Sequence, residues 1–181
     1  MNLYPIHSGY FKLDGGAMFG VVPKTLWERF NPPDENNLCT WAMRCLLVEH
    51  HNRKILIDSG IGDKQSEKFF SLYQPHGEQS LPGSLQEHGF SAEDITDVIH
   101  THLHFDHCGG AIKYDDNGNL APTFPNATYW THKAHWDWAN NPNAREKASF
   151  LPENIRPMED NGVLRFAEEG EFLPDFELRL A

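Results

Sequence analysis

The sequence predicts an α/β or α+β domain in which helices pack on sheets. Short apolar runs with strand periodicity alternate along the chain with segments whose apolar residues recur at helical spacing. The 181 residues include 39% apolar and 23% charged side chains, which is the usage of a folded globular chain. No repeat or low-complexity linker interrupts them, so we expect residues 1–181 to form a single domain.

The first elements expected are a hairpin and two helices. Apolar residues alternate through "CTWAMRCLLVE", the letters "HHNRK" indicate a turn, and "ILI" follows as a second short strand. Asp63–Tyr73 has the spacing of an amphipathic helix. Leu81–His88 predicts a second helix, with Gly89 as its C-terminal stop.

The following elements continue this alternation. Ser91 and Asp94 have the spacing of a helix cap before a short helical turn, and a strand centred on Val98 and Ile99 follows. "YDDNGNL" predicts a turn, "ATYWTH" a strand and "KAHWDWA" a helix. The letters "DFELRLA" alternate apolar and polar residues, which predicts a half-buried strand.

Charge and cysteine content exclude several classes of protein. With 15 Lys and Arg against 26 Asp and Glu, and no basic cluster, the chain is not expected to bind nucleic acid. No signal segment or membrane-length apolar run is found, so no membrane partner is expected. Cys39 and Cys45 would lie about 20 Å apart on one strand, too far for a disulfide. Together with Cys108 they indicate reduced thiols and a cytoplasmic protein.

The stretch "HTHLHFDHCGG" is the richest in chemistry, with four histidines and one aspartate. At the end of an extended strand His102 and His104 point the same way, and a turn would redirect Asp106 and His107 to a neighbouring point. Imidazole and carboxylate ligands without thiolate suit zinc, or else Mn, Fe or Co. The two glycines that follow would let the backbone turn tightly. The spacing therefore predicts a site for two adjacent divalent metal ions.

The remaining histidines have simpler interpretations. Those in predicted turns or on polar helix faces are expected at the surface: His50, His51, His76 and His88. His132 and His135 are three residues apart at a helix start, a spacing that could chelate, but they flank tryptophans of a packed amphipathic helix. We expect neither to be a ligand, unless residues 1–181 alone hold metal fully and catalyse.

The histidine motif resembles the signature of the metallo-β-lactamase fold hydrolases. The motif His102-Leu-His104-Phe-Asp106-His107 follows the strand "DVIHT" and precedes two glycines. The segment "ILIDSG" also resembles the family, and it places Asp58 where the family keeps an aspartate that orients ligand histidines. "GYFKLDGGAMFGVVPKTLW" and "FPNATYWTHKAHWDW" are similar to the branch of N-acyl homoserine lactone lactonases and organophosphate hydrolases.

This resemblance implies a four-layer α/β/β/α sandwich with two metal ions at one edge of its sheets. His102, His104 and a third histidine would hold one ion, while Asp106, His107 and another histidine would hold the second, with a bridging aspartate. Two cations about 3.5–4 Å apart lower the pKa of a shared water toward roughly 7 and polarise a carbonyl or phosphoryl oxygen. Asp106 could also carry a proton to the leaving group.

Two classes of function remain open at this point. The first is a metal-dependent hydrolase that cleaves a small lactone, ester or phosphotriester, with a thioesterase or β-lactamase-type hydrolase of the same family as an alternative. Its apolar substrate wall would include Met18, Phe19, Phe69 and Phe105, although core packing is the simpler interpretation of Phe69. The second is a non-catalytic metal-binding or interaction module. Either could form a homodimer.

Ligand number leads to one further expectation. Four side chains shared between two metals leave two for each, whereas a catalytic zinc normally has three protein ligands. The predicted strand at "DFELRLA" also runs to the last residue, which requires Leu178 and Leu180 to lie in a sheet. We therefore expect the chain to be the N-terminal portion of its domain. A further segment would carry at least two histidines and one aspartate.

Overall fold

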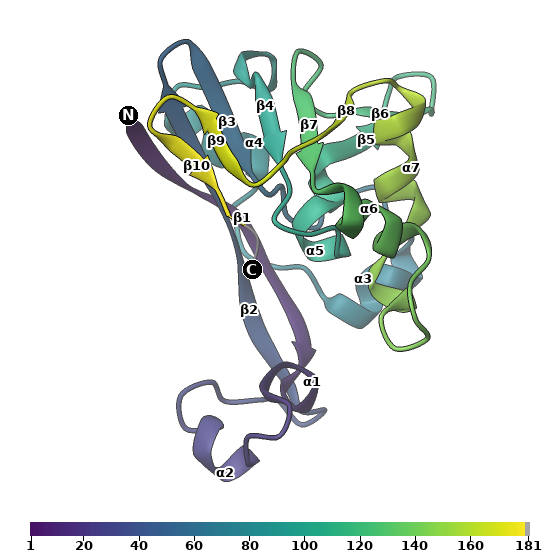
Figure 1. Cartoon of the computed structure of the whole chain (residues 1–181). Coiled ribbons are helices and arrows are strands. Elements are labelled where there is room, and N and C mark those ends of the chain that lie inside the picture. The colour runs from purple at the N-terminus through teal and green to yellow at the C-terminus, as the bar shows by residue number, and fades with distance from the viewer. Residues whose placement is uncertain (180–181) are drawn as a thin grey trace.

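A six-stranded mixed sheet runs through the molecule in the order β1-β2-β3-β4-β7-β8 (Figure 1). The computed structural model describes residues 1–179. The strands are β1 (Asn2–Asp14), β2 (Leu38–His50), β3 (Arg53–Ile57), β4 (Asp97–Ile99), β7 (Thr128–Thr131) and β8 (Leu164–Phe166). β1, β2 and β3 pair antiparallel, whereas β3, β4, β7 and β8 pair parallel. The carboxyl ends of the parallel strands therefore meet at one edge of the sheet.

Helices cover one face of this sheet, and a hairpin lies on the other. α4 (Leu81–Glu87), α6 (Lys133–Asn140) and α7 (Pro152–Asp160) bury Leu85, Trp136 and Met158 in one core with sheet residues such as Leu47, Val98 and Tyr129. The hairpin of β9 (Gly170–Leu173) and β10 (Phe176–Leu178) packs its apolar side chains near Val48, Ile55 and Ile99. The described residues thus form three successive layers and confirm the mixed α/β class.

A long arm projects from the body of the molecule. β1 and β2 extend beyond the other strands as a two-stranded stalk, and α1 (Gly15–Phe19) and α2 (Lys24–Trp27) lie at its tip (Figure 1). The stack of Phe19 on Trp27, with ring centroids 4.6 Å apart, orders this tip. Within the described residues, no helix is both long and apolar enough to cross a membrane.

Smaller elements complete the chain. They are α3 (Glu67–Tyr73), α5 (Phe105–Cys108), the hairpin β5 (Ile112–Tyr114) with β6 (Leu120–Pro122), and the 3₁₀ turns Ala92–Asp94, Gly109–Ala111 and Lys147–Ser149. The predicted turn "YDDNGNL" is the tip of the β5–β6 hairpin. The cap is also confirmed, because the Ser91 amide donates to Asp94 at 2.8 Å.

The structure differs from the sequence-based expectations at several places. The helix expected from Asp63 begins at Glu67, because the Ser66 hydroxyl caps it by accepting from the amide of Phe69 at 3.2 Å. The expectation that His50 is a surface residue was wrong: its side chain is buried and donates to the Pro174 carbonyl at 2.6 Å. Leu178 pairs with Gly170 in a sheet, while Leu180 lies outside the described residues.

Candidate functional site

The histidine motif begins directly after β4, at the carboxyl edge of the parallel strands. Residues alternate in burial from 102 to 105, so that Leu103 and Phe105 enter two separate cores. His102 and His104 are thereby left on the same side, with ring centroids 4.6 Å apart. This is the arrangement expected for side chains two apart in extended backbone.

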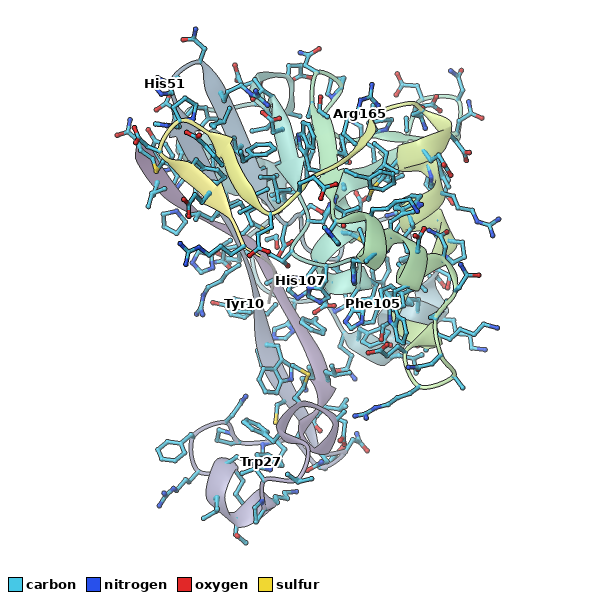
Figure 2. All side chains as sticks on the ribbon, in the orientation of Figure 1. Tyr10, Trp27, His51, Phe105, His107 and Arg165 are labelled. Carbon is cyan, nitrogen blue, oxygen red and sulfur yellow. The ribbon has the colours of Figure 1, made fainter. Side chains whose placement is uncertain are left out.

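A one-turn helix, α5, then brings the other two predicted ligands to the same place. The His107 ring lies 4.0 Å from that of His102, centroid to centroid, and its Nε2 is 3.5 Å from Oδ2 of Asp106. Figure 2 shows His107 and Phe105 together at the foot of the body, beside the stalk. The element that redirects the chain is therefore a short helix and not the turn expected from the sequence.

Asp58 follows β3 and reaches the motif from the neighbouring strand. Its Oδ2 accepts from Nδ1 of His107 at 2.8 Å, and its Oδ1 accepts from the Thr101 amide at 2.9 Å. Its φ of 60° is the left-handed conformation that aspartate and asparagine tolerate better than most residues. With the proton of His107 held on Nδ1, the lone pair of Nε2 is free to act as a ligand.

The Thr101 hydroxyl extends this network to a second histidine. It lies 2.8 Å from Oδ2 of Asp58 and 3.1 Å from Nδ1 of His102. A hydroxyl has one hydrogen, and the carboxylate can only accept it, so Nδ1 of His102 is left to donate to the threonine oxygen. One buried carboxylate thus favours the same tautomer in both rings.

The two glycines of the motif have a different role from the one expected. Neither has a positive φ; a Cβ at Gly109 would lie 2.1 Å from the Ile61 carbonyl oxygen, and one at Gly110 would lie 2.1 Å from that of Ser59. They allow the backbone of the motif to pack directly on the loop that carries Asp58. Close approach, and not turn geometry, requires glycine at both positions.

Lys64 is a residue of this region that no sequence pattern singles out. Its side chain is only 9% exposed, and its Nζ donates to the carbonyl of Gly109. Burial lowers the pKa of Lys64 to about 8. The neighbouring Cys108 is buried as well, and its thiol donates to the Leu103 carbonyl at 3.3 Å, away from the histidine cluster.

Burial favours the uncharged form of two histidines of the cluster. Burial lowers the pKa of His102 to about 4 and also lowers the pKa of His104. Burial opposes the charged form of His107 too, but the hydrogen bond to Asp58 and the charges of Asp106 and Asp58 outweigh it and raise the pKa. Asp58 itself is buried, and its hydrogen bonds to His107 and Thr101 overcome the burial and lower its pKa.

The four residues proposed as a substrate wall separate into two groups. Phe69 packs edge-on against Phe105 at 5.2 Å, and Phe105 is 5% exposed, so both contribute to a small aromatic core beside Asp106. Met18 and Phe19 belong to α1 at the tip of the arm, and the structure does not bring them to the motif (Figure 1). Tyr73, which was not among the expected wall residues, also packs here: its ring is 4.4 Å from that of Phe105, and burial and Asp106 raise its pKa.

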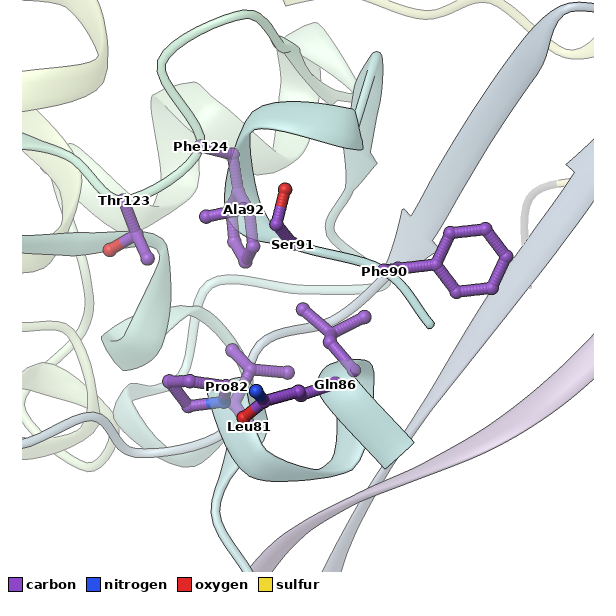
Figure 3. A pocket seen from close by; sticks show the side chains of 9 residues that line it. Leu81, Pro82, Gln86, Phe90, Ser91, Ala92, Thr123 and Phe124 are labelled. Carbon is purple, nitrogen blue, oxygen red and sulfur yellow. The ribbon is translucent and has the colours of Figure 1, made fainter. Parts of the chain in front are cut away.

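A cavity of about 140 Å³ adjoins the cluster. Asp58, Asp106 and His107 line it together with Phe11 and Met43. A larger cavity of about 260 Å³ lies beside α4, between Leu81, Phe90 and Phe124 (Figure 3). No histidine, cysteine, aspartate or glutamate lines that cavity, so the smaller one is the candidate for chemistry.

His132 and His135 both use a ring nitrogen to accept a backbone hydrogen bond. Nδ1 of His132 accepts from the Ala134 amide at 3.3 Å and caps α6. Nε2 of His135 accepts from the Leu103 amide at 2.9 Å. Neither arrangement leaves that nitrogen available to a metal.

The donor set of His102, His104, Asp106 and His107 fits a divalent metal in its chemistry, because it offers imidazole nitrogen and carboxylate oxygen. The number of ligands is too small for a complete site. Among residues 1–179, no group of three histidine, cysteine, aspartate or glutamate side chains is arranged to hold one ion. Such a fit describes part of a ligand set.

The chain is similar to several known proteins. The chain is 34% identical over 120 residues to an N-acyl homoserine lactonase of Bacillus cereus, which covers 60% of this chain and 43% of that protein. It also matches the structure of a probable metal-dependent hydrolase from Staphylococcus aureus at 31% identity and a TM-score of 0.83, covering 96% of this chain and 61% of the other.

The dizinc quorum-quenching lactonase AidC, in complex with a product, has the same fold at 24% identity and a TM-score of 0.68, covering 96% of this chain and 60% of the other. The chain thus spans from less than half to about three fifths of the lengths of these relatives. The family model described as Metallo-beta-lactamase superfamily matches residues 44–175, which is most of the chain. The chain therefore belongs to the metallo-β-lactamase superfamily.

Proposed function

We propose that this chain carries the first half of the active site of a metal-dependent hydrolase that cleaves a small lactone or ester. The observation that carries the proposal is the convergence of four ligand-type side chains beside Asp58, whose carboxylate holds Nδ1 of His107. Two divalent ions, zinc first and Mn, Fe or Co as alternatives, are the cofactors that this donor set favours.

His102 and His104 would hold one ion, and Asp106 and His107 the other. When bound, such ions lower the pKa of water and polarise the carbonyl or phosphoryl oxygen of a substrate. The remaining ligands, at least two histidines and one aspartate, would come from a further segment of the same protein. The observed lack of any three-ligand group among the described residues supports this division of the site.

The chain's own residues would prepare the site for hydrolysis. Asp58 and Thr101 keep the ring protons of His107 and His102 on Nδ1, so that the Nε2 atoms present lone pairs. Asp106 is only partly exposed, beside the cavity of about 140 Å³. Its Oδ atoms would accept a proton and pass it to the leaving oxygen. The aromatic residues packed around Phe105 would shield the same side of the site from water.

Lactones and esters rank first among the candidate substrates. The relatives with lactonase names and the product complex of AidC support this ranking. Phosphotriesters rank second, because polarised phosphoryl oxygens suit the same donor set. Polyanionic substrates rank last, since the net charge of −11 opposes their approach. The three free, buried cysteines support a reducing compartment such as the cytoplasm.

The test is a rate measurement on the native protein loaded with zinc. Its substrates are N-acyl homoserine lactones, aryl esters, phosphotriesters and β-lactams, each also assayed after metal removal by a chelator. We expect metal-dependent turnover of a lactone or ester to exceed that of the other classes. Turnover of β-lactams alone would overturn the ranking. Metal binding without any hydrolysis would favour a non-catalytic metal-binding module.

A further inference from the structure

The backbone between the first two proposed ligands has no partner within regular secondary structure. β4 ends at Ile99 and α5 begins at Phe105, and the intervening residues form neither helix nor strand. Leu103, in the middle of this segment, is completely buried. A buried amide without an acceptor is strongly unfavourable, so its partner decides how firmly the segment is held.

That partner is His135, which comes from a helix 32 residues further along the chain. Its Nε2 lies 2.9 Å from the Leu103 nitrogen. An amide can only donate, so Nε2 is the acceptor and the ring carries its proton on Nδ1. The lone pair that a metal would need is thereby already in use.

The surroundings of His135 keep it in this place. The next residue, Trp136, is 6% exposed and anchors α6 in the main core. Phe150 packs against both rings on one side, with centroids 5.8 Å from His135 and 4.8 Å from His104. The ring of His102 lies 6.3 Å from that of His135, so His135 is close to the proposed ligands.

We propose that His135 is a positioning residue that fixes the direction of His102 and His104 by accepting the Leu103 amide, and that it is not itself a metal ligand. The inference rests on the proposed function, because it assumes that these two histidines bind metal. It explains why a histidine close to the cluster offers no free nitrogen toward it. Outer residues that orient ligands typically change metal affinity by about 10–100-fold when they are lost.

The experiment compares three variants of the 181-residue chain. His135→Phe removes the acceptor, His135→Gln keeps one in its amide oxygen, and His132→Gln is a matched control on the same helix start. The first readout is hydrogen exchange of the Leu103 amide in metal-free protein. The second is Zn²⁺ affinity, measured by competition with a chromophoric chelator.

We expect His135→Phe to accelerate exchange at Leu103 and to weaken Zn²⁺ binding by about 10–100-fold. His135→Gln should restore most of the slow exchange at Leu103 and most of the Zn²⁺ affinity. His132→Gln should match the wild type in both measurements. Unchanged Leu103 exchange in His135→Phe would overturn the proposal. So would equal acceleration at Val98 in the centre of the sheet, because it would indicate general destabilisation.

A third contradictory result is a loss of Zn²⁺ affinity in His135→Gln as large as in His135→Phe, with normal Leu103 exchange. That pattern would identify His135 as a ligand. Zn²⁺ binding by the wild-type chain that does not depend on His102 and His104 would contradict the proposed function instead. The exchange comparison between Leu103 and Val98 would still decide whether His135 holds the segment.

Discussion

The carboxylate of Asp58 accepts a hydrogen bond from Nδ1 of His107 at 2.8 Å, across a sequence separation of 49 residues. This contact joins the end of β3 to α5, and the same carboxylate also accepts from the amide of Thr101. Removing the Asp58 carboxylate would release the rings of His107 and His102, whose tautomers it controls. The consequences for metal binding can be measured directly.

Asp58→Asn should weaken zinc affinity by about 10–100-fold without unfolding the chain. The substitution preserves shape and tolerates the left-handed φ of 60°, but its amide would donate to Nδ1 of His107 and move the ring proton to Nε2. Competition with a chelator measures the change. Asp34→Asn, in the turn before β2, is the control, and equal affinities in both variants would exclude the role of Asp58.

Asp106→Asn should reduce turnover more than it reduces metal content. Loss of a proton carrier typically costs about 10²–10⁴-fold in rate, in addition to any loss of metal. Zinc content and kcat of the native protein and its variant, measured on the same preparations, give the comparison. Parallel losses of zinc and kcat would show that Asp106 acts only as a ligand.

The metal-free chain should lose stability in mild acid partly through His100. Both ring nitrogens of this buried residue lack a partner, and burial lowers the pKa of His100 to about 4, from 6.5 in the unfolded chain. Between these pH values the unfolded state binds a proton that the folded state does not, so stability falls as the pH decreases. The full effect is about 3 kcal/mol.

His100→Leu should therefore flatten the dependence of the free energy of unfolding on pH between about 6.5 and 4. Urea denaturation at several pH values measures it. His51→Asn, at an exposed turn position of positive φ, is the control that should keep the wild-type slope. An unchanged slope in His100→Leu would show that other groups cause the acid sensitivity.

Burial of Lys64 predicts a second rise of stability with pH, in the alkaline range. Burial lowers its pKa from 10.5 to about 8, so between these values only the unfolded chain holds the extra proton. Stability should rise with pH across that window by up to about 3 kcal/mol. Lys64→Met should remove this rise, whereas Lys113→Met, at an exposed position, should not. Equal rises in both variants would contradict the assignment.

Local pattern was sufficient to predict the centre of the site. The alternation through residues 102–105 requires only that Leu103 and Phe105 be apolar, and the resulting side-by-side placement of His102 and His104 follows from backbone geometry. The hairpin of β2 and β3 was predicted for the same reason. Both depend on contacts between residues close in sequence.

The features that were missed depend on contacts distant in sequence. β1 pairs with β2 across separations that run from 24 residues (Asp14 with Leu38) to 47 (Asn2 with Glu49), so the stalk could not be placed from the residues of β1 alone. Lysine is rarely buried, and only the packing of the Gly109 backbone on the loop after Asp58 explains the position of Lys64. The role of His135 likewise depends on where α6 crosses the motif.

X-ray absorption at the zinc edge of the zinc-loaded protein tests the central claim, that the motif side chains hold the metal, most directly. Binding by these side chains should give a first coordination shell of nitrogen and oxygen at about 2.0–2.2 Å with imidazole scattering. That scattering should decrease in a variant that carries His102→Ala and His107→Ala. A sulfur neighbour at about 2.3 Å, or imidazole scattering unchanged in the double variant, would contradict the claim.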